Sequence, residues 1–243
     1  MSKQQKIVKP VDKVASSSIL SSFLEKFESK IWWQIIILVL LPFFLYIKVA
    51  GFEFIDMDDV AIITNNYNII GSIKNIGLAF KTDAFVSATG DFYRPIQTVS
   101  YMLDALVGKE KPWIYHLSNL IYHLITVLAL FALLRKLKLR NTIAFLMALI
   151  FAIHPVLSAG VSWVAARGDV LIGLWGVLLL LSFHNFTQTK NGLYFALHTV
   201  VFSIALFTKE TAVAFPVMML LCYFFVLKEK FNIKALAPFF IIW

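Results

Sequence analysis

The sequence predicts an all-α fold, a polytopic bundle of transmembrane helices whose first outer loop carries amphipathic helices. Composition is the first observation: 60% of the 243 residues are hydrophobic and only 15% are charged, whereas average soluble domains contain about 45–50% apolar and about 25% charged residues. The second is a series of apolar runs close to the ~20 residues that span a bilayer. The third is the concentration of lysine and arginine in alternate loops. An ordinary soluble enzyme and a disordered chain are both disfavoured.

The first apolar run follows a basic tail. Residues 1–30 contain six lysines, and we expect a cytoplasmic segment whose second half is a weakly amphipathic helix. The run from Ile31 to Ala50 starts too late and is too long for a cleaved signal peptide, so it predicts the first span. Residues 31–243 form the predicted transmembrane region.

Residues 51–112 form the predicted first outer loop, because this segment is too polar to span a membrane. Within it, Ser72 to Phe80 and Pro95 to Val107 place apolar residues at helical spacing. Both stretches predict amphipathic helices on the outer membrane surface. Proline suits the first position of the second helix.

Five further apolar runs complete the predicted bundle, at residues 113–134, 142–159, 170–186, 192–207 and 211–227. Another run begins at residue 235 and is too short to span before residue 243. The sequence therefore predicts six complete helices and the start of a seventh. We expect the chain to be an N-terminal fragment of a longer protein.

The net charge of +8 is explained by topology. With the N-terminus in the cytoplasm, fourteen of the 22 lysine and arginine residues fall on the inner side of the membrane and eight on the outer side. Four acidic residues lie inside and ten outside. This distribution obeys the positive-inside rule, so the basicity predicts orientation and no nucleic-acid partner. The single cysteine, Cys222, excludes an internal disulfide.

Acidic residues follow the first span closely. Asp58 and Asp59 lie a few residues beyond its end. An adjacent carboxylate pair at a membrane surface can act as a general base or hold a divalent cation. From spacing alone, a solvated acidic loop is the favoured alternative.

Polar residues also mark the second and third spans. His116, Asn119 and His123 are spaced to share one helix face, which should turn toward the bundle interior. A role in hydrogen bonding between helices is an equal alternative to a role in the site. His154 precedes Pro155, where the third helix must kink or continue beyond the proline.

Charged residues occur at two later positions on the predicted outer side. Arg167 and Asp169 flank the start of the fourth span, where a local ion pair is the simplest explanation. Lys209 and Glu210 interrupt the apolar stretch 192–227, whose 36 residues would make one helix about 54 Å long. Two slightly short helices are therefore predicted, with the Lys–Glu tip drawn toward the membrane. A structural ion pair within the tip is the alternative.

The convergence of these acids and bases on one side suits a substrate with a lipid tail and an anionic head, because arginine and lysine bind phosphate. Nucleotide-binding loops, an HExxH motif and Cys/His metal spacings are all missing from the sequence.

The pattern resembles the GT-C superfamily of membrane glycosyltransferases, and within it the protein O-mannosyltransferase-like family whose membrane region precedes tetratricopeptide repeats. The resemblance covers about Asp56 to Pro216. It rests on segments in family order: DDVAIITNN (58–66), YRP (93–95), HLSNLIYH (116–123), HP (154–155), ARGD (166–169) and TKETA (208–212).

The resemblance implies a GT-C helical bundle and an inverting transferase on the extracytoplasmic face. A mannose-like hexose would pass from a polyprenyl-phosphate donor to a hydroxyl acceptor, either protein Ser/Thr or a glycan. The family's carboxylate pair supplies the catalytic base, which maps to Asp58 and Asp59. The candidates for binding the donor phosphate are Arg94, Arg167 and Lys209. The residues that would shape the cavity or orient those cations are His116, His154, Asp169 and Glu210.

The sequence departs from the family pattern after His154–Pro155, where Leu157 and Ala159 replace a histidine and a glutamate. This leaves the acceptor open, and it puts in doubt any metal or acceptor binding by that stretch. The sequence establishes no cofactor, and a divalent cation is an open candidate. The expected surroundings are the lipid bilayer of a bacterial inner membrane or of the endoplasmic reticulum. A transporter or flippase of polyprenyl-linked glycans and a non-catalytic membrane scaffold are the alternative functions.

Overall fold

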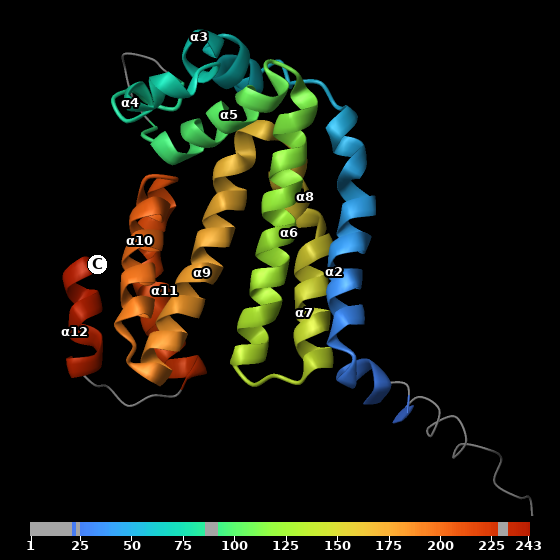
Figure 1. Ribbon diagram of the computed structural model, residues 1–243, viewed down its shortest axis with the longest axis vertical. Helices are drawn as coiled ribbons and strands as arrows, with labels where there is room; N and C mark the ends of the chain where they lie inside the picture. The colour runs from blue at the N-terminus through green and yellow to red at the C-terminus, as the bar shows by residue number, and fades with distance from the viewer. Residues whose placement is uncertain (1–20, 23–24, 86–91, 228–232) are drawn as a thin grey trace, which may run out of the picture.

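The computed structural model describes residues 21–22, 25–85, 92–227 and 233–243. Within these ranges the chain forms helices and no strands, so the all-α prediction is confirmed. Figure 1 shows long helices side by side with a group of short helices across one end of the bundle. We call residues 52–111, which connect the first long helix to the second, the cap.

Three helices are long and apolar enough to cross a membrane. They are α2 (Ile31–Tyr46) with its extension η1 (Ile47–Gly51), α6 (Pro112–Lys136), and α9 (Arg167–Thr189) with the preceding turn η5 (Val164–Ala166). The central helix α6 packs against α2, α7 and α9. Away from the cap, two large clusters of buried aliphatic and aromatic side chains hold the bundle together, as expected for a bundle built from apolar runs. A multi-pass membrane protein is therefore confirmed.

The third predicted span is bent. Helix α7 (Asn141–Ile153) ends before His154, and η4 (Pro155–Leu157) and α8 (Ser158–Ser162) continue at an angle of 49°. Proline lacks a backbone N–H and forces the preceding residue into extended conformation, which His154 adopts. The bent pair counts as a fourth span if both parts cross together.

The last predicted pair of spans is short, as the charged break at Lys209–Glu210 predicts. Helix α10 (Gly192–Leu206) has 15 residues and corresponds to about 22 Å. After a break, η6 (Glu210–Ala214), α11 (Phe215–Leu221) and η7 (Cys222–Val226) continue the chain, and α12 (Ile233–Ile242) follows. The predicted division into two short helices is confirmed. The expectation of six full-length spans is not met, because the described residues contain three or up to four.

The cap contains a π-helical turn η2 (Val60–Thr64), the short helices α3 (Tyr67–Ile70), η3 (Ile73–Asn75) and α4 (Ile76–Ala79), and α5 (Pro95–Gly108). The predicted helix over 95–107 is confirmed. Over the predicted helix at 72–80, the 3₁₀ turn η3 runs directly into the short α4, and the Asn75 side chain donates to carbonyl groups of α3. The cap has its own core, which includes Ile63, Tyr101 and Tyr115.

At the opposite end of the bundle, the side chain of Glu28 binds the N-terminus of α7. The carboxylate of Glu28 accepts hydrogen bonds from the backbone N–H of Asn141 (2.6 Å) and of Thr142 (2.7 Å), and from the Thr142 hydroxyl (2.5 Å). A carboxylate is favourable at a helix N-terminus. These hydrogen bonds, above all the one from the Thr142 hydroxyl, hold the pKa of Glu28 below its usual value.

Candidate active site at the cap end of the bundle

The predicted carboxylate pair is divided between two environments. Asp59 is fully buried, and its two oxygens accept hydrogen bonds from the backbone N–H of Ile55 (3.1 Å) and of Ala165 (2.8 Å). Burial raises the pKa of Asp59, and the two backbone donors act against this rise. Asp58 is half-buried at the surface of the cap. Asp59 therefore fastens the cap to the bundle, and Asp58 is the carboxylate of the pair that a substrate can reach.

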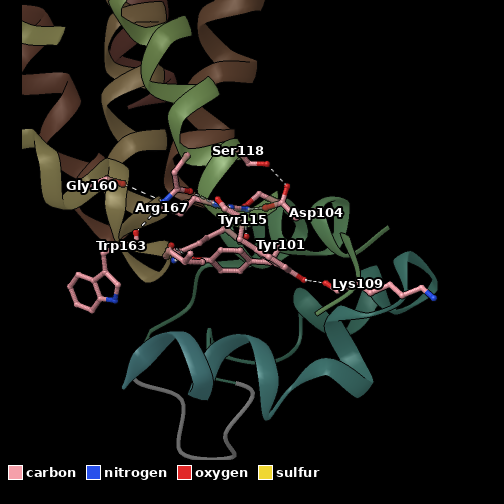
Figure 2. Close-up of polar contacts among 12 residues, drawn as sticks. Tyr101, Asp104, Lys109, Tyr115, Ser118, Gly160, Trp163 and Arg167 are labelled. Carbon is pink, nitrogen blue, oxygen red and sulfur yellow. Dashed lines mark hydrogen bonds and ion pairs between the residues drawn. The ribbon is translucent and has the colours of Figure 1, made fainter. Parts of the chain in front are cut away.

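Arg167 lies in a buried polar cluster (Figure 2). Its side chain is 0% exposed, and one guanidinium nitrogen is 2.5 Å from a carboxylate oxygen of Asp104 in α5. Its Nε donates to Asn119 Oδ1 and another nitrogen donates to the Tyr115 carbonyl, both at 2.7 Å. The guanidinium also lies over the Tyr101 ring, 4.4 Å from its centroid. The simple prediction of a local Arg167–Asp169 ion pair is wrong.

This burial does not fit the predicted direct contact of Arg167 with a donor phosphate. A charged group is retained inside a protein when it is paired and its remaining donors are satisfied, and Arg167 meets both conditions. The side chain joins α5, α6 and α9 at one point, so we assign it a positioning role.

Sequence reasoning missed Asp104, the carboxylate that neutralises Arg167. It also accepts a hydrogen bond from Ser118 at 2.5 Å. Asp104 lies on the same face of α5 as Gln97 and Tyr101, at helical spacing, and all three are buried. The sequence did contain a signal for this role, because Asp104 is a charged residue on the predicted buried face of the amphipathic helix over 95–107.

The other predicted cations form accessible ion pairs. Arg94 makes a bidentate contact with Glu210, with Nε–Oε2 and Nη2–Oε1 distances of 3.0 and 2.6 Å. Lys209 pairs with Asp169 of α9. The side chains of the two cations are 16% and 17% exposed, whereas those of the two carboxylates are 57% and 63% exposed. The alternative explanation, an ion pair between Lys209 and Glu210, is therefore wrong. We call these four residues the ionic rim.

Three chain segments bring the ionic rim together. The backbone N–H of Ile96, at the start of α5, donates to the Phe207 carbonyl at the end of α10 (3.0 Å). The start of α9 lies so close to α5 that a Cβ atom on Gly168 would be 2.7 Å from Gln97 Oε1. A larger residue at this position would meet the Gln97 side chain of α5, which would have to shift to make room. The break after α10 thus places Lys209 and Glu210 beside α5 and α9.

The histidines occupy different places. His116 and His123 are buried in α6, as is Asn119 between them, so the predicted interior-facing stripe is confirmed. His123 Nε2 is 2.9 Å from the Ala152 carbonyl, and Asn119 donates to carbonyl groups of the α8 region. These contacts favour hydrogen bonding between helices. His154 is exposed at the bend after α7, and none of its contacts joins it to the ionic rim.

A cavity of about 300 Å³ lies between α6, α7, α8 and α9. Most of its lining is apolar, including Phe151, Val156 and Val170. Asp169 of the ionic rim contributes to the wall, and His123 lies in the same lining. The cavity therefore combines an apolar interior with one charged residue of the rim. Among the described residues, no group of three or more His, Cys, Asp or Glu side chains is arranged to hold a metal ion.

Comparison with known proteins gives a consistent group of relatives. The chain is 29% identical over 147 residues to protein O-mannosyl-transferase TMTC3 of Homo sapiens, covering 58% of this chain and 15% of that protein. It is 32% identical over 152 residues to protein O-mannosyl-transferase tmtc2 of Xenopus laevis (60% and 18%). It is 28% identical over 172 residues to protein O-mannosyl-transferase TMTC1 of Mus musculus (64% and 18%).

No family model and no solved structure matches the chain. The chain spans less than a fifth of the length of these three curated relatives. Over the matched part, the resemblance predicted from the sequence is confirmed, and the chain is similar to the protein O-mannosyl-transferases named TMTC1, TMTC2 and TMTC3.

Proposed function

We propose that this chain is part of a glycosyltransferase that moves a mannose-like sugar from a polyprenyl-phosphate donor to a serine or threonine hydroxyl of a protein. The names of the relatives support mannosyl transfer to protein. The observation that carries the proposal is the ionic rim, where two partly covered cations at the cap end are held by two exposed carboxylates. The reaction would take place on the extracytoplasmic face, with the N-terminus in the cytoplasm.

The proposed base is Asp58. A hydroxyl is a poor nucleophile until its proton is removed, and a half-buried carboxylate at the cap surface is suited to accept it. The acceptor oxygen then forms a bond to the anomeric carbon from the face opposite the phosphate. The bond from that carbon to the phosphate oxygen breaks, so the configuration inverts and the lipid phosphate leaves with the electron pair. Asp59 would hold the turn that carries Asp58.

Arg94 and Lys209 are the proposed donor-phosphate ligands. Cations placed where negative charge develops on a leaving group lower the reaction barrier. Arginine binds a phosphate in the same bidentate manner in which Arg94 holds Glu210 here. An incoming phosphate would exchange with the carboxylates of Glu210 and Asp169, which keep the cations oriented in the free site. The apolar cavity beside Asp169 offers space for isoprenoid units of the donor.

The test compares two adjacent carboxylates. Asp58→Asn and Asp59→Asn are each introduced into the whole protein, reconstituted in vesicles with a polyprenyl-phosphate-mannose donor and a serine/threonine peptide. We expect Asp58→Asn to fold normally, bind donor and lose at least about 100-fold in transfer rate. We expect Asp59→Asn to lower folded yield, because the buried fastening is weakened.

A third variant, Arg94→Gln, tests the proposed phosphate ligand, and we expect it to bind the donor with a weaker apparent affinity. Transfer by Asp58→Asn at the parent rate would refute the assignment of the base. Donor flipping without transfer, in all variants and the parent, would favour a flippase instead.

A further inference from the structure

A second cavity lies at the end of the bundle opposite the cap, where Figure 1 shows the turn between α6 and α7. Its volume is about 260 Å³. Three helix ends contribute to it: the end of α6 with the following turn, the last turns of α9, and the end of η7. We call it the basic pocket, and its lining residues are Lys136, Leu137, Lys138, His184, Gln188, Val226 and Leu227.

The basic pocket is lined by more hydrogen-bond donors than acceptors. Among the described residues, Lys136 donates one hydrogen bond, to Asn185 Oδ1 at 2.9 Å, which leaves two N–H bonds of its ammonium group without a partner there. Lys138 is exposed on the turn after α6. Neither lysine takes part in any of the ion pairs found among the described residues. At the cavity wall, the buried Nδ1 of His184 has no hydrogen-bond partner within the described part of the chain.

The opposite wall of the basic pocket is aliphatic. Val226 is 53% exposed, and the neighbouring Phe225 is 74% exposed on the outside of the bundle. These apolar side chains continue the surface that a helix of a membrane protein presents to lipid tails. The cavity thus has cations on one side and an apolar border on the other, which matches an amphiphile with an anionic head.

We propose that the basic pocket binds the phosphate headgroup of an anionic phospholipid. Basic pockets between helices at the cytoplasmic membrane surface recognise such headgroups, and the positive-inside distribution places this end of the bundle there. The C-terminal ends of α6 and α9 point toward this end and carry partial negative charge, which opposes a small free anion. An anionic lipid would overcome this repulsion because its headgroup contacts the two lysines and its tails contact the aliphatic wall of the pocket. The site is independent of the proposed transferase reaction.

A matched pair of lysines makes the test specific. Lys138 and Lys190 are both exposed, both follow the end of a helix at this end of the bundle, and both have left-handed backbone with φ of 64° and 56°. Only Lys138 lines the basic pocket. Lys138→Gln and Lys190→Gln therefore remove the same charge from the same backbone geometry, and a change in folding should be shared by both variants.

The experiment measures lipid retention by the whole purified protein with native mass spectrometry after delipidation. Phosphatidylglycerol, phosphatidylcholine and inorganic phosphate are the three probes. We expect the parent to retain phosphatidylglycerol in preference to phosphatidylcholine. We expect Lys138→Gln and Lys136→Gln each to reduce retention of phosphatidylglycerol about fivefold, with Lys190→Gln unchanged.

Three results would overturn the proposal. Equal retention of the two lipids by the parent would show that the anionic headgroup is not recognised. Equal losses in Lys138→Gln and Lys190→Gln would show attraction to surface charge without a defined pocket. Displacement of phosphatidylglycerol by millimolar inorganic phosphate would show a site for free phosphate. If Lys138→Gln alone is poorly folded, Lys136→Gln decides between these results and the proposal.

Discussion

Removal of Asp104 is expected to destabilise the protein strongly, because it leaves Arg167 charged and buried. The Arg167 side chain is 0% exposed, so water cannot replace the lost carboxylate. Breaking a buried ion pair by removing one partner costs about 3–5 kcal/mol. For a domain of 150–250 residues this corresponds to a fall of roughly 6–20 °C in apparent Tm.

The assay follows thermal unfolding of the detergent-solubilised protein by size-exclusion chromatography for three variants. Asp104→Ala tests the broken pair. Asp104→Leu combined with Arg167→Met replaces both charges by apolar groups, which is often neutral for buried pairs, so at least half of the lost stability should return. Glu210→Gln removes the partner of Arg94 in an exposed pair and should cost less than ~1 kcal/mol.

A Tm for Asp104→Ala within about 2 °C of the parent would refute this reasoning. It would mean that the guanidinium reaches solvent in the folded protein. Failure of the double variant to recover would mean that the pair, rather than the unpaired charge, supplies the stability.

Three further predictions concern packing at Gly168, the pH dependence of stability and the orientation in the membrane. Gly168→Ala should lower the stability by about 1–3 kcal/mol in the same thermal assay, because the new Cβ atom would meet a buried side chain of α5, whereas Gly192→Ala, with no atom within 4 Å, should have little effect. The pKa of Glu28 is lower in the folded state than in the unfolded state. The ionised carboxylate therefore stabilises the fold above the unfolded-state pKa of about 4.3, and this stabilisation is lost as the pH falls through the lower, folded-state pKa. A pH series of Tm should show this contribution in the parent and not in Glu28→Gln. In a cysteine-free background, Lys109→Cys should react with a membrane-impermeant maleimide in intact cells, and Lys138→Cys should react only after permeabilisation; the reverse pattern would contradict the proposed orientation.

The bundle was largely predictable from the sequence, because its helices are set by local properties. Apolar runs of sufficient length predicted α2, α6 and α9. The His154–Pro155 pair predicted the bend after α7, because the steric clash between a proline and the residue before it depends only on the local sequence. The shortness of α10 was also expected from the charged break at Lys209 and Glu210, although the number of full-length spans was overestimated.

The pairing of the candidate site residues was not predictable, because partners lie far apart along the chain. Arg167 and Asp169 are neighbours in sequence, yet one side chain turns inward to α5 and the other outward to Lys209. Residues two positions apart on a helix point in different directions, so proximity in sequence was a poor guide. The division of roles between Asp58 and Asp59 has the same cause, since burial depends on how the cap packs on residues 163–166.

The fastening of the cap has a consequence for how the molecule moves. Ala165 accepts a hydrogen bond from Gln97 through its carbonyl and donates one to Asp59 through its N–H, and Arg167 two residues later holds Asp104. The first turn of the cap and its last helix are thus tied to the same three-residue stretch. We therefore expect a tilt of the α9 start to displace both parts of the cap together, because both are bonded to residues 165–167.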